Sequence, residues 1–158
     1  MILFAAIGGL FALMGFFVYY ASLDNPDLEK IEIELANVEL FDVAPIDNRA
    51  RLEVTFLVKN PSEKTFTVPL ITYELFANGT SIGKGQYSTE DIAMPGRAAF
   101  YPGSEIPLKS KISIVNSESY EHLFRAIVNF EYVSFSVEGE ITAQTAWSLI
   151  EKEFQSSM

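Results

Sequence analysis

The sequence contains no cysteine and a single histidine, His122, among its 158 residues. Without cysteine there is no disulfide framework, no thiol nucleophile and no zinc-thiolate site, and one histidine excludes a histidine-rich metal site. Phosphate-binding, dinucleotide-binding and metalloprotease motifs are also missing, because the Gly83-Lys84-Gly85 stretch is too short and continues into a predicted strand. We therefore predict that the protein is not an enzyme and that it has no catalytic residue, metal or cofactor.

The residues around His122 allow one catalytic arrangement to be imagined. Glu118, Ser119 and His122 together contain the groups of a Ser-His-acid triad. In a triad the nucleophile meets the base while a third group orients that base. Three residues on one short predicted helix cannot adopt that geometry, so we do not expect His122 to be catalytic.

Charged residues are missing from positions 1–23, and residues 1–21 form an unbroken run of apolar residues, alanine and glycine. A helix of 21 residues is about 30 Å long, which matches the hydrocarbon core of a bilayer. Tyr19 and Tyr20 would then lie at the level of the lipid head groups. We predict a transmembrane helix at residues 1–23, a linker at 24–30 and one domain at 31–158.

A cleaved signal peptide is the alternative for this segment. It would have a basic start and a small-x-small cleavage site, whereas no Lys or Arg precedes the run and Tyr19-Tyr20-Ala21 places aromatic residues near its end. Asp24, Asp27 and Glu29 follow at once, so no positive cluster holds this flank inside. We expect a single-pass protein of the cell membrane with an extracytoplasmic domain.

Basic residues are scarce, since 11 Lys and Arg stand against 21 Asp and Glu, which gives a formal net charge of −10. Such a charge repels nucleic acid, so we expect no nucleic-acid partner, while the lipid bilayer is the partner of residues 1–23. Several acids fall between Asp24 and Asp47, where extracellular Ca²⁺ could bind. The alternation of Glu32 and Glu34 with apolar residues favours the solvated face of a strand instead.

Alternating apolar and polar residues predict strands through most of the domain. The Asn78-Gly79 pair is the strongest hairpin signal, and a shift of the apolar positions at Ala36-Asn37 predicts a β-bulge. The expected strands are residues 31–40, 52–59, 68–76, 81–87, 106–115 and 132–138, the last continuing towards 145.

Helical spacing replaces this alternation at residues 117–128, where Ser117 could cap a helix of about three turns. Residues 146–158 fit either a last strand or a frayed helix. The pattern predicts a mostly β protein, an immunoglobulin- or fibronectin-like β-sandwich of about seven strands with one short helix.

The order of these signals resembles the LEA14-like or WHy domain of the group-2 late embryogenesis abundant proteins. The matching residues are 58–61, ending in Asn60-Pro61, then 71–75, 82–85 and 92–95. The resemblance covers about residues 35–141. It implies a fibronectin-like sandwich with stress-protective or lipid-binding associations, often behind an N-terminal membrane anchor, and it supplies no catalytic residue.

Two short motifs have plain structural explanations. Pro61 ends strand pairing because it lacks an N–H, and the Asn60 side chain can bond the turned backbone. Asn78-Gly79-Thr80 is also an N-x-[ST] glycosylation acceptor, and Asn78 would lie at an exposed hairpin tip in either case. Asn78 is thus a candidate glycosylation site if the domain lies outside the cell.

Small residues lie four positions apart in the apolar segment, as Ala5 with Gly9 and Gly8 with Ala12. Such stripes let two helices approach closely in lipid, although they also arise by chance. We expect a homo- or hetero-oligomer held partly through this face.

Three classes of function follow. The first is a membrane-anchored, non-enzymatic LEA14-like domain with a stress-protective or cell-surface role. The second is a structural subunit of a membrane complex or of an archaeal pilin-like filament, packed through its N-terminal helix. The third, an enzyme, is disfavoured by the missing residues.

Overall fold

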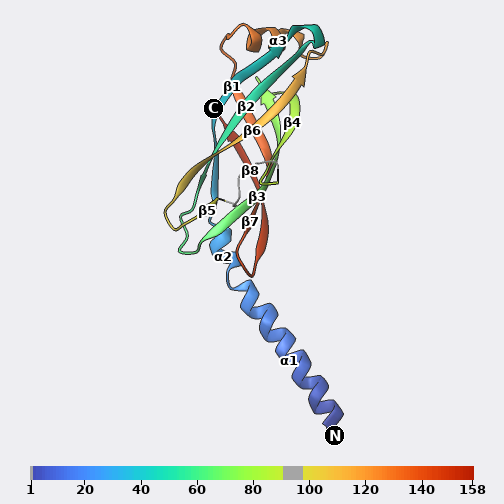
Figure 1. Cartoon of the computed structure of the whole chain (residues 1–158), viewed down its shortest axis with the longest axis vertical. Helices are drawn as coiled ribbons and strands as arrows, with labels where there is room; N and C mark the ends of the chain where they lie inside the picture. The colour runs from blue at the N-terminus through green and yellow to red at the C-terminus, as the bar shows by residue number, and fades with distance from the viewer. Residues whose placement is uncertain (1, 91–97) are drawn as a thin grey trace.

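The computed structural model describes residues 2–90 and 98–158. An elongated β domain stands on a single long helix, α1 (Ile2–Ser22), which projects from one end of it (Figure 1). A one-turn helix, α2 (Asn25–Leu28), joins the two parts. We call the end of the domain beside α2 the base, and the opposite end, which carries the short helix α3 (Glu121–Val128), the distal end.

Two antiparallel sheets form the domain. One sheet has the order β1 (Glu32–Ala44), β2 (Arg49–Lys59) and β6 (Glu105–Val115). The other has the order β4 (Thr80–Ser88), β3 (Phe66–Ala77), β7 (Phe135–Gln144) and β8 (Leu149–Ser157), with β5 (Ala99–Phe100) also beside β3. A 3-10 turn, η1 (Pro45–Asp47), connects β1 to β2. The predicted β-sandwich with one short helix and an apolar N-terminal helix is confirmed.

The sheets enclose a core built from alternate residues of the strands. Val54, Phe56 and Val58 on β2 are fully buried, as their alternation predicts. Phe56 packs edge-on against Tyr73 of the opposite sheet, with 4.9 Å between ring centroids, and against Phe154. Burial of apolar side chains contributes roughly 25 cal/mol for each Å² removed from water.

Side-chain hydrogen bonds join the sheets along both edges. The backbone N–H of Leu35 on β1 donates to Oγ of Ser156 on β8, at 2.9 Å. On the other edge, the Ser110 hydroxyl of β6 donates to the Gln86 carbonyl of β4 at 2.7 Å and accepts from the Tyr73 hydroxyl at 2.9 Å. Bonds to buried polar groups in this way hold the two sheets in register.

The predicted turns follow their local chemistry. Asn78 and Gly79 both have positive φ, at 48° and 81°, as a type I′ hairpin requires. The pairing of β1 with β2 shifts between Leu35 and Asn37, where the sequence predicts a bulge. A second shift, between Leu40 and Asp42, has no signal in the alternation.

The predicted helix at residues 117–128 is too long. The helix α3 begins at Glu121, and Ser117 does not cap it; the Ser117 side chain accepts from the Ser119 N–H, at 3.4 Å. Tyr120 has a non-helical φ of −144°, and its hydroxyl donates to the carbonyl of Val115 at 2.6 Å. This bond ties residues 117–120 to the end of β6, and the helix begins only after them.

The remaining expectations differ from the structure in smaller ways. The strand predicted from residue 132 begins at Phe135, and the ambiguous tail forms strand β8. The linker at 24–30 contains α2, with Pro26 in its first turn, where a missing N–H has no cost. Residues 92–95, part of the family resemblance, lie outside the described residues.

Candidate functional site

The base of the domain is fastened directly to the end of α1. Leu28 of α2 and Ile31 beyond it are fully buried in the core. The Asp24 carboxylate accepts from the Thr145 hydroxyl at 3.1 Å and lies 3.4 Å from Nζ of Lys64. These contacts tie the segment after α1 to two separate turns of the sandwich, so the domain does not hang on a free linker.

Two further contacts strengthen this attachment. The Ser148 hydroxyl donates to the Asn25 side-chain oxygen. Lys152 of β8 donates from Nζ to the carbonyl oxygens of Glu29 and Ile31, at 2.9 and 2.7 Å. The hairpin between β7 and β8 therefore forms hydrogen bonds with the chain at both ends of α2.

Asn60 organises the turn that follows β2. Only 1% of its surface is exposed, and both atoms of its amide are fully engaged. Its Nδ2 donates to the carbonyls of Lys64 and Phe100, both at 2.8 Å, while Oδ1 accepts from the N–H and the hydroxyl of Ser62. An amide with two donors and one carbonyl oxygen has no bonding capacity left for a ligand here.

The backbone of Asn60 extends the same network to a second turn. Its N–H donates to the Ser104 carbonyl at 2.9 Å, and its carbonyl accepts from the Gly103 N–H at 2.8 Å. Gly103 has a φ of +75°, which favours glycine. Asn60 thus joins the turns after β2 and β5, while the neighbouring Pro61 is exposed and stops strand pairing.

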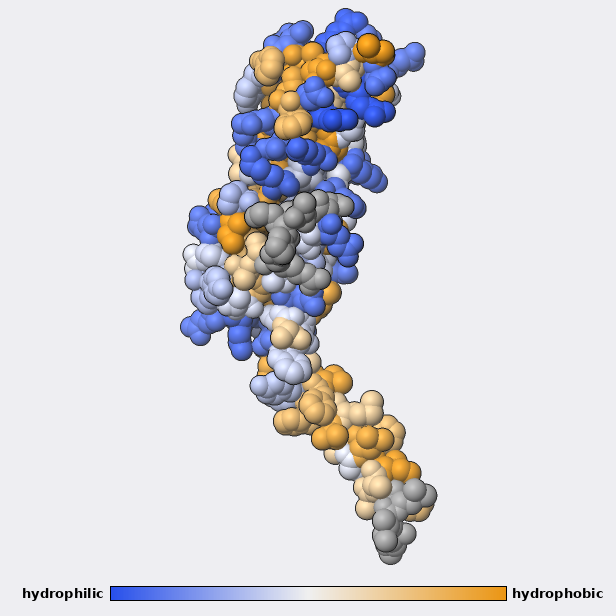
Figure 2. All heavy atoms as spheres, in the orientation of Figure 1, coloured by the Kyte–Doolittle hydropathy of each residue, from blue (hydrophilic) through white to orange (hydrophobic). Residues whose placement is uncertain are grey.

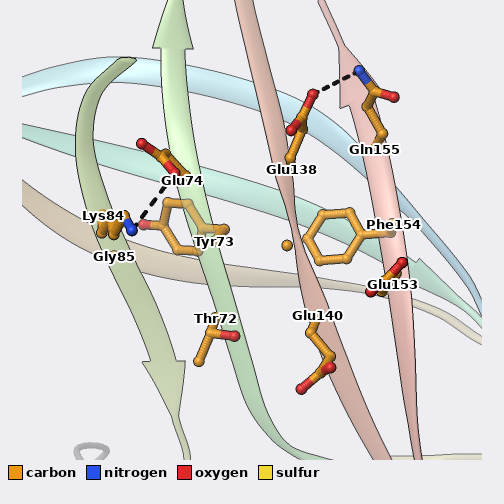
Figure 3. A pocket seen from close by; sticks show the side chains of 11 residues that line it. Thr72, Tyr73, Glu74, Lys84, Gly85, Glu138, Glu140, Glu153, Phe154 and Gln155 are labelled. Atoms are coloured by element: carbon orange, nitrogen blue, oxygen red, sulfur yellow. Dashed lines mark hydrogen bonds and ion pairs between the residues drawn. The ribbon is translucent and has the colours of Figure 1, made fainter.

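An open hollow of about 940 Å³ lies on the outer face of the larger sheet (Figure 3). Its polar side chains come from four adjacent strands, β4, β3, β7 and β8, and most of them are acidic. Lys84 is the cation at its rim, 3.8 Å from Glu74, and Gln155 donates to Glu138 at 3.0 Å. The carboxylates that line it are Glu74, Glu138, Glu140 and Glu153.

The carboxylates of the acidic face do not form a metal-binding cluster among the described residues. Nowhere in residues 2–90 and 98–158 do three or more His, Cys, Asp or Glu side chains gather as a metal site would require. The face is a hydrated surface of like charges, which repels other anions.

Tyr73 lies beneath this hollow and explains Gly85, one of the two glycines of the family resemblance. A Cβ on Gly85 would lie 2.5 Å from the Tyr73 ring, and one on Gly83 would lie 3.1 Å from Ile112. Burial raises the pKa of the Tyr73 hydroxyl, and its hydrogen bond with Ser110 opposes that shift in part. Packing against Tyr73 therefore accounts for Gly85, whereas a side chain at Gly83 would require only a small shift of Ile112.

A second, smaller hollow of about 380 Å³ lies at the distal end between β1 and the segment that follows α3. Val38, Leu40 and Ile127 contribute to its apolar walls. Phe130 stands at its rim with 81% of its surface exposed and with a φ of +58°. A bulky residue in the left-handed region is rare, since that conformation favours glycine.

The residues singled out for catalysis do not come together. Glu118, Ser119 and His122 are exposed at the distal end. Within the described residues no hydrogen bond joins His122 to either of the other two, so the structure contains no triad at this place. Asn78 is exposed at its hairpin tip, and its side-chain oxygen accepts from the Ser134 N–H at 3.0 Å.

Ala5, Gly8, Gly9 and Ala12 are exposed along α1, and a Cβ at either glycine would meet no atom within 4 Å. The surface of α1 is apolar on the side that Figure 2 shows, in contrast to the largely hydrophilic domain. Among the described residues, α1 is the one helix that is long and apolar enough to cross a membrane. A signal sequence would have the same length and composition.

Sequence reasoning missed the contacts that make the base rigid. Thr145 and Ser148 meet Asp24 and Asn25 across more than a hundred residues of chain, and no spacing rule connects them. The ambiguity between strand and helix at residues 146–158 concealed the hairpin. The signal that could have indicated the hairpin is an apolar alternation that ends at Ala143 and resumes at Ile150.

No family model and no curated protein match the sequence. A crystal structure of a protein from Archaeoglobus fulgidus has a TM-score of 0.50 at 18% identity, over 80% of this chain and 94% of the other. A solution structure of a protein from Arabidopsis thaliana has a TM-score of 0.54 at 16% identity, over 80% of each chain.

A solution structure of a protein assigned provisionally to the late embryogenesis abundant group has a TM-score of 0.49 at 12% identity, over 98% of this chain and 84% of the other. Identities this low concern the fold and not the activity. The domain behind the apolar N-terminal helix shares its β-sandwich fold with the structures from Archaeoglobus fulgidus and Arabidopsis thaliana.

Proposed function

We propose that the protein is a membrane-anchored, non-enzymatic LEA14-like domain that works on the extracytoplasmic side, in a stress-protective or cell-surface role. The observation that carries this proposal is the direct attachment of the sandwich to the end of α1. Asp24 and Asn25, which follow the helix, are both bonded to the β7–β8 hairpin. A domain fastened in this way is suited to stand at a membrane surface.

The chemistry of the domain surface supports a role without catalysis. The acidic hollow of the larger sheet, with Glu138 and Glu140 near its centre, is open and hydrated. In Asn60, the most specific residue of the family resemblance, the side-chain nitrogen and oxygen are both fully hydrogen-bonded within the domain. A charged, hydrated surface held close to lipid fits protection through weak contacts.

The anchor and its orientation are tested in cells. Intact mass analysis of the membrane-bound protein should find residues 2–22 retained, whereas their loss would identify α1 as a signal sequence. Protease added to intact cells should degrade the domain, because the acidic flank at Asp24, Asp27 and Glu29 favours an extracytoplasmic position. Protection of the domain until lysis would reverse the orientation.

The protective role is tested separately with vesicles that carry the full chain. After freezing and thawing they should retain more of an enclosed dye than vesicles that carry α1 alone. The control isolates the contribution of the domain from that of a spanning helix. Equal leakage from the two preparations would contradict a protective role and leave the anchor intact.

A structural subunit is the second candidate, and the small residues of α1 favour it. Gly8 and Gly9 leave the helix surface open to close approach by another backbone. The particle state in mild detergent separates the candidates. A filament or a complex of fixed size would favour the structural subunit, and a monomer would favour the solitary anchored domain.

A further inference from the structure

Trp147, the single tryptophan of the chain, lies at the tip of the hairpin between β7 and β8. Its side chain is 68% exposed, and Leu149 beside it is 54% exposed. Other large apolar side chains are also exposed, but Phe130 and Tyr132 lie at the distal end, whereas Trp147 and Leu149 lie at the base, beside the end of α1. The tip itself is rigid, because Thr145 bonds the N–H groups of both Trp147 and Ser148.

The hairpin tip lies beside the C-terminal end of α1 (Figure 1). Thr145 and Ser148, on either side of Trp147, bond Asp24 and Asn25, and α1 ends at Ser22. Asp24 is two residues beyond Ser22, and Thr145 is two residues before Trp147. Because consecutive Cα atoms are about 3.8 Å apart, the path from the helix end to Trp147 through the bond between Asp24 and Thr145 is short. The position of Trp147 along the membrane normal is therefore set by where α1 ends.

A helix of the length of α1 reaches across the hydrocarbon core, and Tyr19 and Tyr20, both exposed, then lie at its outer boundary. The polar interface beyond that boundary is roughly 5 to 8 Å thick on each side. Tryptophan is enriched at that level, because its ring is apolar while its N–H can bond water or head groups. A side chain held beside the end of α1 would lie at that depth.

We propose that Trp147, with Leu149 beside it, inserts into the head-group region of the bilayer that α1 crosses. The domain then has two contacts with the membrane, a spanning helix and an aromatic hairpin, and stands at a fixed tilt. This inference rests on the proposed membrane anchor. It does not rest on electrostatic attraction, since the net charge of −10 and the exposed Glu29 and Glu63 at the base oppose binding to anionic lipid.

The single tryptophan makes the test direct. The full chain is assembled into nanodiscs of phosphatidylcholine with or without bromine on the acyl chains near the head groups. Co-purification of the chain with the discs reports the anchor, and tryptophan emission reports Trp147 alone. We expect emission at a shorter wavelength than in unfolded protein, and we expect brominated lipid to remove most of it, in 1 M salt as in low salt.

The control moves the probe to the opposite end of the domain. The double variant Trp147→Phe and Tyr132→Trp places the tryptophan at an exposed distal position, where Tyr132 has 92% of its surface exposed. Its emission should respond to aqueous acrylamide and not to brominated lipid.

Each result has a defined meaning. Chains that fail to enter the discs would contradict the anchor, and hence the proposed function. Chains that enter the discs while Trp147 behaves like the distal probe would overturn this inference alone. Trp147 shielded from both quenchers would also overturn it, because a protein partner or a second copy would then cover the hairpin.

Discussion

The two ends of the sandwich are closed in different ways. The basal half contains aromatic rings that are almost wholly buried, with Phe56 at 0% and Phe66 and Phe100 at 1% exposure, the last two stacked 5.4 Å apart. The distal end is covered by α3, whose Phe124 and Ile127 remain 8% and 6% exposed. A hollow of about 380 Å³ lies next to Ile127.

Polar groups differ less between the two ends. At the base, Asn60 satisfies all of its side-chain bonds, but Oγ of Ser104 in the adjoining turn is buried without a partner among the described residues. At the distal end, Oδ1 of Asn116 is also buried without one, and Phe130 adopts a positive φ. The contrast between the ends therefore lies in the packing of their apolar side chains.

The largest expected effect tests the packing of the basal core. Phe56→Ala should lower the free energy of unfolding by about 3–5 kcal/mol, because it removes a fully buried ring that contacts Tyr73 and Phe154. Phe124→Ala on α3 should cost less, since that ring is already in part exposed. Urea melts of the domain compare the two, and equal losses would remove the contrast between the ends.

Glu53→Ala is the matched control on the outer face of β2. Glu53 pairs with Lys109 across the strands at 2.5 Å, and that bond raises the pKa of Lys109. A pair of this kind at the surface contributes little to stability, because water and salt screen its charges. A loss as large as that of Phe56→Ala would mean that the inner and outer faces of β2 are exchanged.

The second effect compares two asparagines. Asn60→Ala should destabilise the domain by about 3 kcal/mol, because the carbonyls of Lys64 and Phe100, the second of them in a buried bond, lose their donors. Asn116→Ala should cost less than about 1 kcal/mol, since its side-chain oxygen has no bond to lose. Similar thermal melts for both variants would contradict the role given to Asn60.

The third effect concerns alkaline pH. Burial raises the pKa of Tyr73 above its unfolded value of about 10, so its neutral form is stabilised in the folded state. That stability is complete below about pH 10 and is lost as pH rises through the folded pKa. Tyr73→Phe should cost about 1 kcal/mol at neutral pH, for the bond to Ser110, and should flatten the loss above pH 10. If Tyr73→Phe loses stability above pH 10 as steeply as the unmodified protein, a group other than Tyr73 causes that loss.

The fourth effect is a gain. Phe130 occupies the position after α3 where the Glu131 N–H bonds the Ala126 carbonyl and the Phe130 N–H bonds that of Ile127, a Schellman arrangement usually made with glycine. Phe130→Gly should stabilise the domain by about 0.5–1 kcal/mol by relieving the positive φ. Destabilisation would mean that the exposed ring contributes packing at the distal hollow.

The smallest effect on the domain comes from changes in α1. Gly8→Leu and Gly9→Leu should leave unfolding of the sandwich unchanged, because these positions contact none of its described residues. If the small-residue face holds an oligomer, native mass analysis in detergent should show fewer assembled chains than for Ala12→Gly, which keeps the face small. An identical distribution for all variants would leave α1 as an anchor only.

The sequence was most informative where one local rule decides the structure. Uniform apolar composition determines that residues 2–22 form a helix suited to lipid, and alternation determines which faces of β2 and β6 are buried. Asn78-Gly79 determines its own turn, because both residues tolerate positive φ. Local preference and global packing agree at these places.

Only the tertiary structure decided how these parts are joined. The bonds from Asp24 to Thr145 and from Tyr73 to Ser110 connect residues that are 121 and 37 positions apart. Tyr120 leaves the helix pattern because its hydroxyl bonds Val115, and β8 is a strand because β7 offers it an open edge. Such choices depend on which partners the fold brings within hydrogen-bonding distance, and periodicity along the chain contains no information about that.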